Sequence, residues 1–348
     1  MATAKAKPRK KLRILLMPFF ATSHIGPFTD LAFHLVAARP QDVEATVAVT
    51  PANAVLVQSY LARRGAGQAT VKVATYPFPS VDGLPPGVEN QSTVKATDAW
   101  RIDSVATDEK MMRPGQESLI RERSPDLVIT DVHFWWNVDV ATDIGVPCMT
   151  FHVIGTFPTL AMFNLSHAAG AIDAAGNGQV KRAYFVGPLL LPSPPQVAAG
   201  TYNSRCIDWL DKKPPQSVVY LCFGSLTHIS KAQLGELAFG LEAFEKPFLW
   251  VIRSETWVLP EGWKERVGDR GLVITGWAPQ NVILAHRAVG AFVTHCGWNS
   301  VLETVVAGVP VLTWPMVFEQ FITERFVTKV LAIGSGCGQR VLGEKHKV

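Results

Sequence analysis

The sequence predicts an α/β protein built from two doubly wound domains, each with a parallel sheet between layers of helices. Short runs of apolar and β-branched residues alternate with amphipathic segments along most of the chain. Such alternation is typical of parallel sheets that helices cover on both faces. It occurs twice, on either side of a proline-rich segment at 187–195. The length of 348 residues, at about 150 residues per domain, also indicates two domains.

In the first half of the chain, the apolar runs have the length and residue types of buried strands. They lie at 12–19, 44–49, 70–76, 126–130 and 147–153. Between several of them, apolar residues recur at the spacing of an amphipathic helix. These helical segments are 28–38, 52–64 and 134–144. The alternation predicts one parallel sheet from this half.

The second half repeats the pattern with its own strands and helices. The candidate strands are 217–223, 247–252, 271–275, 290–294 and 310–314. The candidate helices are 230–245, 299–307 and 318–331. The glycine-rich run at 334–338 lacks the spacing of a dinucleotide-binding loop, so we predict a flexible turn there.

These patterns divide the chain into four parts. They are a basic tail at 1–13, a first domain at 14–188, a proline-rich linker at 189–203 and a second domain at 204–348. Doubly wound sheets bind ligands beyond the carboxyl ends of their strands. We therefore expect a functional site in a cleft between the two domains.

Charge and cysteine content exclude several classes of protein. The net charge is +4, but residues 1–13 carry six basic side chains and no acidic one, which leaves −2 for the remainder. A slightly acidic body argues against a nucleic-acid-binding protein, and we expect the tail to be a solvated terminus. The five cysteines show no CxxC spacing, so we expect reduced thiols in a cytoplasmic protein and no structural zinc site.

The apolar segments predict neither a membrane span nor a cleaved leader. The run at 12–20 is short, contains Pro18 and has no small-residue cleavage pattern after it. The stretch at 304–318 is too short to cross a bilayer and is interrupted by glycine and proline. The sequence also lacks a Walker-type phosphate loop, a GxSxG elbow and an HExxH motif, which excludes the enzyme classes that depend on them.

The segment 277–320 holds a dense group of polar and aromatic residues at the ends of predicted elements. A buried strand runs into His295, and a helix starts at Asn299 or Ser300 after a tight turn. The unpaired N–H groups at such a helix start attract an anion. Ser300 and Glu303 also have the spacing of a capping box, which any helix can use, so spacing alone leaves both interpretations open.

The same segment resembles, nearly position for position, the donor-binding signature of the plant family-1 UDP-sugar glycosyltransferases. The resemblance extends to MPFFATSHIGPFTDLA, PDLVITDVHFWW, YFVGPLL and CIDWLDKKPPQSVVYLCFGSLT. It implies the GT-B fold, in which one Rossmann-like domain binds a small-molecule acceptor and the other binds a UDP-sugar donor.

By this resemblance, the donor contacts belong to the second domain. Trp277 would stack on the uracil beside the backbone of Ala278, and the ribose would contact Gln280 and Glu303. The diphosphate would be held around the turn at Gly297 by Ser225, His295, Asn299 and Ser300. The sugar hydroxyls would contact Trp298, Glu319 and Gln320, a pattern that in the family is typical of glucose users.

Two residues of the first domain are candidates for catalysis. His24 lies in the loop after the first strand, and Asp131 ends the strand at 126–130, so both lie at carboxyl ends of strands in one sheet. The resemblance implies that His24 takes the proton of the acceptor hydroxyl and that Asp131 orients its ring. It also implies inversion without a metal ion. Other histidines, including His34 and His133, are expected to be structural.

The chain departs from the family in two places. Relatives have a much longer run where this chain has 155–184, and they continue beyond the position of Val348, so both domains are expected to be shortened. We expect a cytoplasmic, monomeric enzyme that transfers glucose from UDP-glucose to a flavonoid, phenylpropanoid or terpenoid hydroxyl. The alternative is a catalytically inactive remnant that only binds UDP-sugar or a partner.

Overall fold

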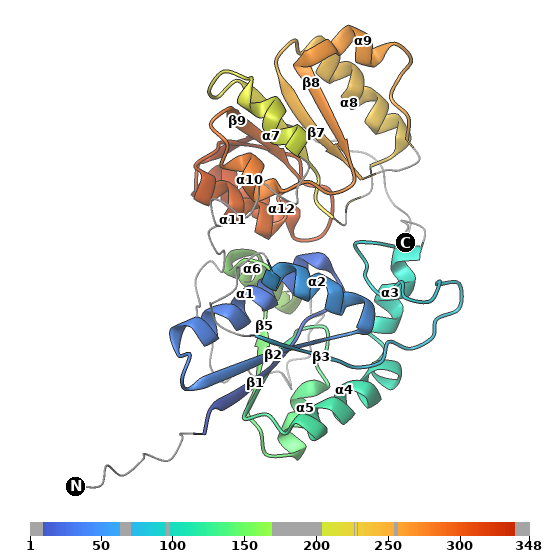
Figure 1. Cartoon of the computed structure of the whole chain (residues 1–348), viewed down its shortest axis with the longest axis vertical. Coiled ribbons are helices and arrows are strands. Elements are labelled where there is room, and N and C mark those ends of the chain that lie inside the picture. Colours follow the sequence, from blue (N-terminus) through green and yellow to red (C-terminus); the bar gives the residue numbers. More distant parts are fainter. Residues whose placement is uncertain are drawn as a thin grey trace, which may run out of the picture. The chain divides into compact units, whose positions relative to one another are not determined.

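The structure is a computed structural model in which the chain forms two compact units. It describes residues 10–62, 71–94, 98–168, 204–225, 227, 229–253 and 257–337. The described residues up to Val153 form one unit, and those from Ile154 onward form the other. Each unit has its own sheet (Figure 1). The predicted linker at 189–203 and most of the predicted basic tail lie outside the described residues.

The first unit contains a five-stranded parallel sheet in the order β3-β2-β1-β4-β5. Its strands are β1 Leu12–Met17, β2 Val43–Val49, β3 Lys72–Thr75, β4 Leu127–Asp131 and β5 Cys148–Phe151. Each overlaps a predicted strand. In β1, Ile14 and Leu16 pack into one core, whereas Leu15 and Met17 pack into another. The continuous apolar run is needed because successive side chains point to opposite faces and both faces are buried.

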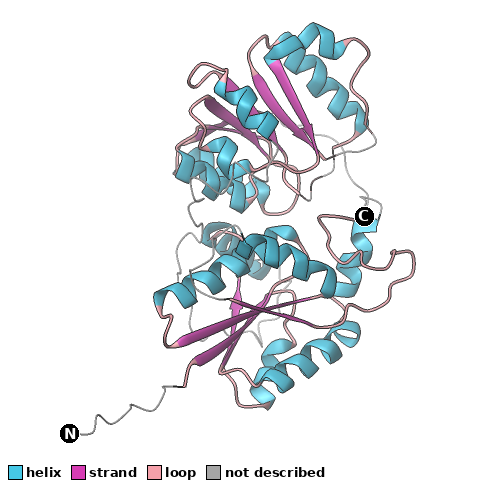
Figure 2. Cartoon of the chain, viewed as in Figure 1, coloured by secondary structure: helices cyan, strands magenta, loops and turns pink. Residues whose placement is uncertain are grey.

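Helices cover both faces of this sheet (Figure 2). They are α1 Thr22–Ala38, α2 Pro51–Ala62, α3 Ala99–Ala106, α4 Glu109–Arg123 and α5 Asn137–Asp143. Residues of α1 and α2 share the core that contains Ile14, and residues of α3, α4 and α5 share the core that contains Leu15. This is the predicted doubly wound arrangement.

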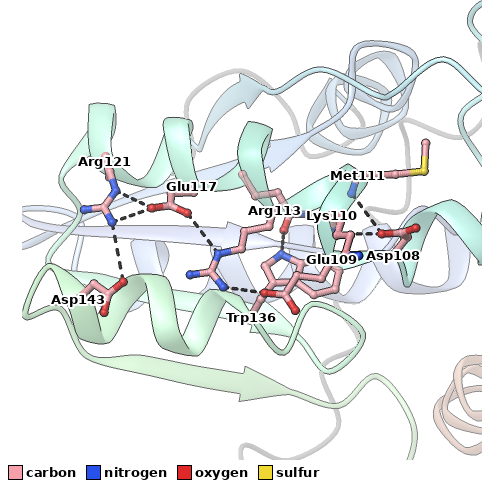
Figure 3. Close-up of polar contacts among 10 residues, drawn as sticks. Asp108, Glu109, Lys110, Met111, Arg113, Glu117, Arg121, Trp136 and Asp143 are labelled. Atoms are coloured by element: carbon pink, nitrogen blue, oxygen red, sulfur yellow. Dashed lines mark hydrogen bonds and ion pairs between the residues drawn. The ribbon is translucent and has the colours of Figure 1, made fainter.

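Apolar periodicity does not predict α4, because charged side chains dominate this helix. Asp108 caps its N-terminus by accepting hydrogen bonds from two backbone N–H groups of the first turn. Arg113 bonds Glu109 at 2.6 Å and Glu117 at 3.3 Å, each four residues away (Figure 3). Such pairs stabilise a helix by a few tenths of a kcal/mol each, so local contacts support α4 in addition to its buried face.

A buried glutamine connects α4 to its surroundings. Gln116 accepts a hydrogen bond from Trp136 Nε1 at 2.7 Å and donates one to the Tyr76 hydroxyl at 3.3 Å. The substitution Gln116→Leu leaves both partners buried without this contact, so we expect the free energy of unfolding to fall by about 1–3 kcal/mol, measured by urea denaturation. Adding Tyr76→Phe removes the hydroxyl that has lost this partner and should recover part of the lost unfolding free energy. No recovery would show that packing, and not hydrogen bonding, dominates there.

The second unit contains a six-stranded parallel sheet in the order β11-β10-β9-β6-β7-β8. Its strands are β6 Val218–Cys222, β7 Phe248–Ile252, β8 Gly271–Thr275, β9 Val289–Thr294, β10 Val311–Thr313 and β11 Gly334–Gly336. All but β11 overlap predicted strands. The flexible turn predicted at 334–338 is wrong, because β11 pairs in parallel with β10. A side chain at Gly334 would collide with Val311, so the glycine permits this close pairing.

The helices of the second unit include one from the range 14–188, which was predicted to form the first domain. They are α6 Thr156–Ala168, α7 Ser204–Asp211, α8 Lys231–Ala243, α9 Trp263–Val267, α10 Gln280–Leu284, α11 Trp298–Ala307 and α12 Gln320–Arg325. α6 contacts α12, and the rings of Phe157 and Phe326 stack 5.0 Å apart. In the part of the chain that the structure describes, no helix is both long and apolar enough for a membrane span.

Both sheets have the strand order of a Rossmann fold. In such a sheet all strands are parallel, and the order in which they follow one another along the chain reverses between two central strands. The reversal lies between β1 and β4 in the first sheet and between β9 and β6 in the second. Ligands of such folds bind beyond the carboxyl ends of the strands at this position. Candidate site residues follow or end all of these strands, namely His24, Asp131, Ser225 and His295.

Candidate active site

The turn between β9 and α11 is shaped by a buried histidine and two glycines. His295 follows β9, and its ring packs against Gly224 and Gly297, where an added Cβ would collide with Nε2. The predicted order of strand, turn and helix is correct. The left-handed residue of the turn is Cys296, with a φ of 66°. Gly297 is therefore needed for close approach to the imidazole and not for unusual backbone angles.

The start of α11 differs from the prediction in one respect. The helix begins at Trp298, with Gly297 as its N-cap, so Asn299 and Ser300 both lie inside its first turn. Ser300 therefore cannot be the N-cap of a capping box with Glu303, and that alternative is wrong. The first N–H groups of any helix have no partner within the helix, and they are a suitable site for an anion.

His295 is uncharged at neutral pH. Its side chain is almost fully enclosed, and burial lowers the pKa of His295 to about 4. Among the described residues, nothing forms a hydrogen bond with its Nδ1. A neutral imidazole has one donor and one acceptor nitrogen, so His295 can offer an anion a hydrogen bond but no positive charge.

The low pKa of His295 makes stability depend on pH. The unfolded ring takes up a proton near pH 6.5, whereas the folded protein resists protonation down to about pH 4. The unfolded state binds more protons in this window, so the free energy of unfolding falls as the pH drops from 6.5 toward 4. At pH 5, His295 lowers the free energy of unfolding by about 2 kcal/mol relative to neutral pH. Between pH 7 and pH 5, urea denaturation should show a smaller loss of unfolding free energy for His295→Gln than for wild type. Equal losses in the two proteins would contradict a low pKa for His295.

A group of hydrogen-bonded side chains connects β6, α10 and α11. Gln280, the first residue of α10, donates through Nε2 to the Ser300 hydroxyl at 2.9 Å and to the Glu303 carboxylate at 2.6 Å. Its Oε1 accepts a hydrogen bond from the buried Tyr220 hydroxyl at 3.3 Å. Both Nε2 hydrogens are used inside the protein, so Gln280 orients Glu303. Tyr220 could not be identified as a site residue from the sequence, because no pattern distinguishes a strand tyrosine of the site from one of the core.

Two tryptophans have different surroundings. Trp277, in the loop between β8 and α10, is 51% exposed and offers a flat surface to a ring, while the adjacent Ala278 is buried. Trp298, the first residue of α11, lies with its ring 6.2 Å from that of Phe326. It also covers Gly155, where an added Cβ would lie 2.8 Å from the indole. Trp298 thus packs against both Phe326 and Gly155.

The remaining predicted donor residues lie at the ends of elements. Gln320 is 5% exposed, and its Oε1 accepts hydrogen bonds of 3.0 Å from the backbone N–H groups of residues 316 and 317. It therefore fixes the loop before α12. Glu319 directly precedes α12. Ser225 follows Gly224 in the turn after β6.

In the first unit, the structure brings His24 and Asp131 together. His24 Nδ1 lies 2.7 Å from Asp131 Oδ2 at the end of β4. His24 was predicted in a loop, but α1 begins at Thr22, so His24 lies in the first turn of the helix. The backbone N–H of Phe19 also donates to Oδ2, at 3.2 Å. Because Nδ1 is engaged, Nε2 is the nitrogen that can accept a proton from a ligand.

His133 binds the other oxygen of the same carboxylate. Its Nδ1 lies 2.6 Å from Asp131 Oδ1, and its backbone N–H donates to that oxygen at 3.2 Å. Burial acts to raise the pKa of Asp131, but the charges and hydrogen bonds of His24 and His133 outweigh it and hold that pKa well below its usual range. The signal in the sequence is the spacing of two residues after the strand end, from which a side chain can turn back toward Asp131.

Two Rossmann-like sheets, one with a His–Asp pair and one with a turn whose helix start suits an anion, are typical of nucleotide-sugar transferases. The chain belongs to the plant family-1 UDP-glycosyltransferases. A family model described as UDP-glucoronosyl and UDP-glucosyl transferase matches residues 205–336.

Relatives support this membership over nearly the whole chain. Scopoletin glucosyltransferase of Nicotiana tabacum is 33% identical, over 94% of this chain and 84% of that protein. UDP-glucose flavonoid 3-O-glucosyltransferase 7 of Fragaria ananassa is 32% identical, over 96% of this chain and 82% of that protein. The alignment with the tobacco enzyme spans 416 positions, more than the 348 residues of this chain, so that enzyme has residues that this chain lacks. Much of the predicted shortening at 155–184 lies outside the described residues.

Solved structures match both units. Glycyrrhiza uralensis UGT73P12, complexed with glycyrrhetinic acid 3-O-monoglucuronide, gives a TM-score of 0.76 at 26% identity and covers 95% of this chain and 82% of that one. Arabidopsis thaliana UGT89C1, complexed with UDP-L-rhamnose, gives 0.75 at 28% identity and covers 94% and 85%. The chain therefore has the predicted GT-B fold class and is a UDP-glycosyltransferase. The comparisons do not favour the inactive remnant.

Proposed function

We propose that this chain transfers glucose from UDP-glucose to a hydroxyl of a small lipophilic plant metabolite, with inversion at the anomeric carbon. The observation that carries the proposal is the 2.7 Å contact between His24 Nδ1 and Asp131 Oδ2. The names of relatives support the acceptor class, because scopoletin, anthocyanins and flavonoids are phenolic compounds. The same names support glucose as the transferred sugar.

His24 acts as the general base in this proposal. Its Nδ1–H donates to Asp131, so the lone pair on Nε2 accepts the proton of the acceptor hydroxyl as the oxygen attacks the anomeric carbon. The new C–O bond forms as the bond from that carbon to the diphosphate oxygen breaks, and UDP leaves with the electron pair. A single displacement on an α-linked donor gives a β-glucoside. Asp131 stabilises the imidazolium that forms on His24.

The second unit binds the donor in this proposal. Trp277 stacks on the uracil beside Ala278, and the ribose contacts Gln280 and Glu303, with Glu303 oriented by Gln280. The diphosphate contacts Ser225, His295, Asn299, Ser300 and the N–H groups of α11 that follow Gly297. Because these donors and the helix dipole stabilise the departing anion, no metal ion is required. The sugar hydroxyls contact Trp298, Glu319 and Gln320.

The first unit supplies the acceptor site, and the protein works as a cytoplasmic monomer without a nucleic-acid partner. The support for a reducing compartment is the spacing of the cysteines. Size-exclusion chromatography with light scattering tests the monomer directly.

Turnover of UDP-glucose against a panel of phenolic acceptors tests the proposed function, with UDP binding measured by calorimetry on the same sample. We expect a β-glucoside product and slower reaction with UDP-galactose, UDP-glucuronate and UDP-L-rhamnose. A folded protein that binds UDP but glucosylates no acceptor would overturn the proposed activity and leave the binding remnant. A folded protein that binds no UDP would overturn the donor site itself.

A further inference from the structure

The buried carboxylate of Asp131 is shared between two imidazole rings. His24 Nδ1 lies 2.7 Å from Oδ2, and His133 Nδ1 lies 2.6 Å from Oδ1. The backbone N–H groups of Phe19 and His133 complete the set, one on each oxygen at 3.2 Å. An ionised carboxylate only accepts hydrogen bonds, so each ring presents an N–H to it at Nδ1.

Phe19 fixes the relative position of the two rings. Its ring centroid lies 5.2 Å from that of His24 and 4.4 Å from that of His133, and the imidazoles are 5.4 Å apart at an angle of 68°. The exposed fraction of the side chain is 17% for His24, 36% for His133 and 1% for Asp131. The carboxylate is therefore enclosed, and His133 forms the more open side of the group.

We infer that His133 is a positioning residue for His24, on which it acts through the shared carboxylate. This inference rests on the proposed function, in which His24 is the base. The Nδ1–H of His133 prevents rotation of the carboxylate, so Oδ2 stays directed at His24 Nδ1 and Nε2 keeps its lone pair. It also draws negative charge toward Oδ1, so Asp131 holds a proton on His24 less strongly than a carboxylate without this donor would.

Other titratable groups act on the same cluster. Asp103 of α3 and His152, just after β5, interact electrostatically with His133, and Tyr76, just after β3, interacts with Asp131. Burial lowers the pKa of His152 and raises the pKa of Tyr76, so both are uncharged at neutral pH. These three residues are present and unchanged in any variant of position 133. A comparison of two such variants therefore isolates the hydrogen bond to Oδ1.

Two substitutions separate the hydrogen bond from packing. His133→Phe keeps a ring against Phe19 but removes the donor, whereas His133→Asn keeps an N–H donor where Nδ1 now lies. We expect His133→Phe to lower kcat by about 10–100-fold, as for the loss of a hydrogen bond to a charged group, with the KM for UDP-glucose unchanged. The acidic limb of its pH–rate profile should move to higher pH, because Asp131 then holds the proton on His24 more strongly. His133→Asn should restore most of the rate and return the limb to its original position.

Nitrogen-15 NMR titration of the histidine rings measures the same effect without turnover, with His24→Gln used to assign the His24 signal. We expect the His24 titration to move to higher pH in His133→Phe and to stay in place in His133→Asn. An unmoved His24 titration in His133→Phe, or equal losses of kcat in the two variants, would overturn the inference. Absence of turnover by the wild type would instead overturn the proposed function, and the NMR comparison would still decide the role of His133.

Discussion

Replacing His24 by alanine is expected to lower kcat by about 10²–10⁴-fold, the usual contribution of a positioned general base. The ring is held by the buried Asp131 at 2.7 Å, and alanine removes the proton acceptor without adding bulk. All proposed donor-binding residues lie in the second unit, so the affinity for UDP should change little. Steady-state kinetics with UDP-glucose and a phenolic acceptor, together with calorimetry of UDP binding, measure both quantities.

Asp131→Asn tests the same pair by replacing the residue that orients His24. An amide can donate to Nδ1 and favour the wrong imidazole tautomer, so we expect a loss of rate of comparable order. His34→Ala is the matched control, because His34 lies on the same helix as His24 and contributes nothing to the proposed chemistry. Full activity in both His24→Ala and Asp131→Asn would remove the pair from the mechanism.

The fold was predictable where elements are buried and less so at the edges. Strands β1 to β10 were predicted because a parallel strand covered on both faces requires an apolar run. The strand β11 consists of Gly334–Gly336 and has no apolar side chain, so only its pairing with β10 identifies it. Helix α4 has a strongly polar surface, and its cap at Asp108 and its ion pairs do not produce an apolar periodicity.

The site was predictable to the extent that topology alone decides it. Residues at carboxyl ends of adjacent parallel strands lie at one edge of the sheet, which is why His24 and Asp131 could be expected to meet. The choice between a capping box and an internal helix position at Ser300 depends on where α11 begins, and the spacing fits both. The contacts of Gln280 with Tyr220 and of His133 with Asp131 depend on side-chain orientation across the folded core, which spacing along the chain does not determine.

Gly297→Ala is expected to weaken UDP binding by about 10²-fold or more. The added methyl group would occupy the space of His295 Nε2, while a φ of −61° suits alanine as well as glycine. The effect therefore isolates the steric contact, unlike a substitution at Gly224, where φ is 76°. The imidazole is enclosed in a packed interior, so either the ring or the start of α11 must move. Moving these donors away from the diphosphate removes a hydrogen bond to a charged group, worth about 1.5–3 kcal/mol, which corresponds to a loss of affinity on the order of 10²-fold.

Gly235→Ala is the matched control, because a Cβ at this position of α8 meets open space and alanine favours a helix by up to about 1 kcal/mol. It should leave UDP binding unchanged. Overpacking at Gly297 costs about 1–3 kcal/mol, so we expect a folded variant with a lower Tm in thermal unfolding and little UDP binding in calorimetry. Wild-type affinity in that folded variant would show that the diphosphate does not bind against His295 and the start of α11. The anion site of the second unit would then have to lie at another of its strand ends.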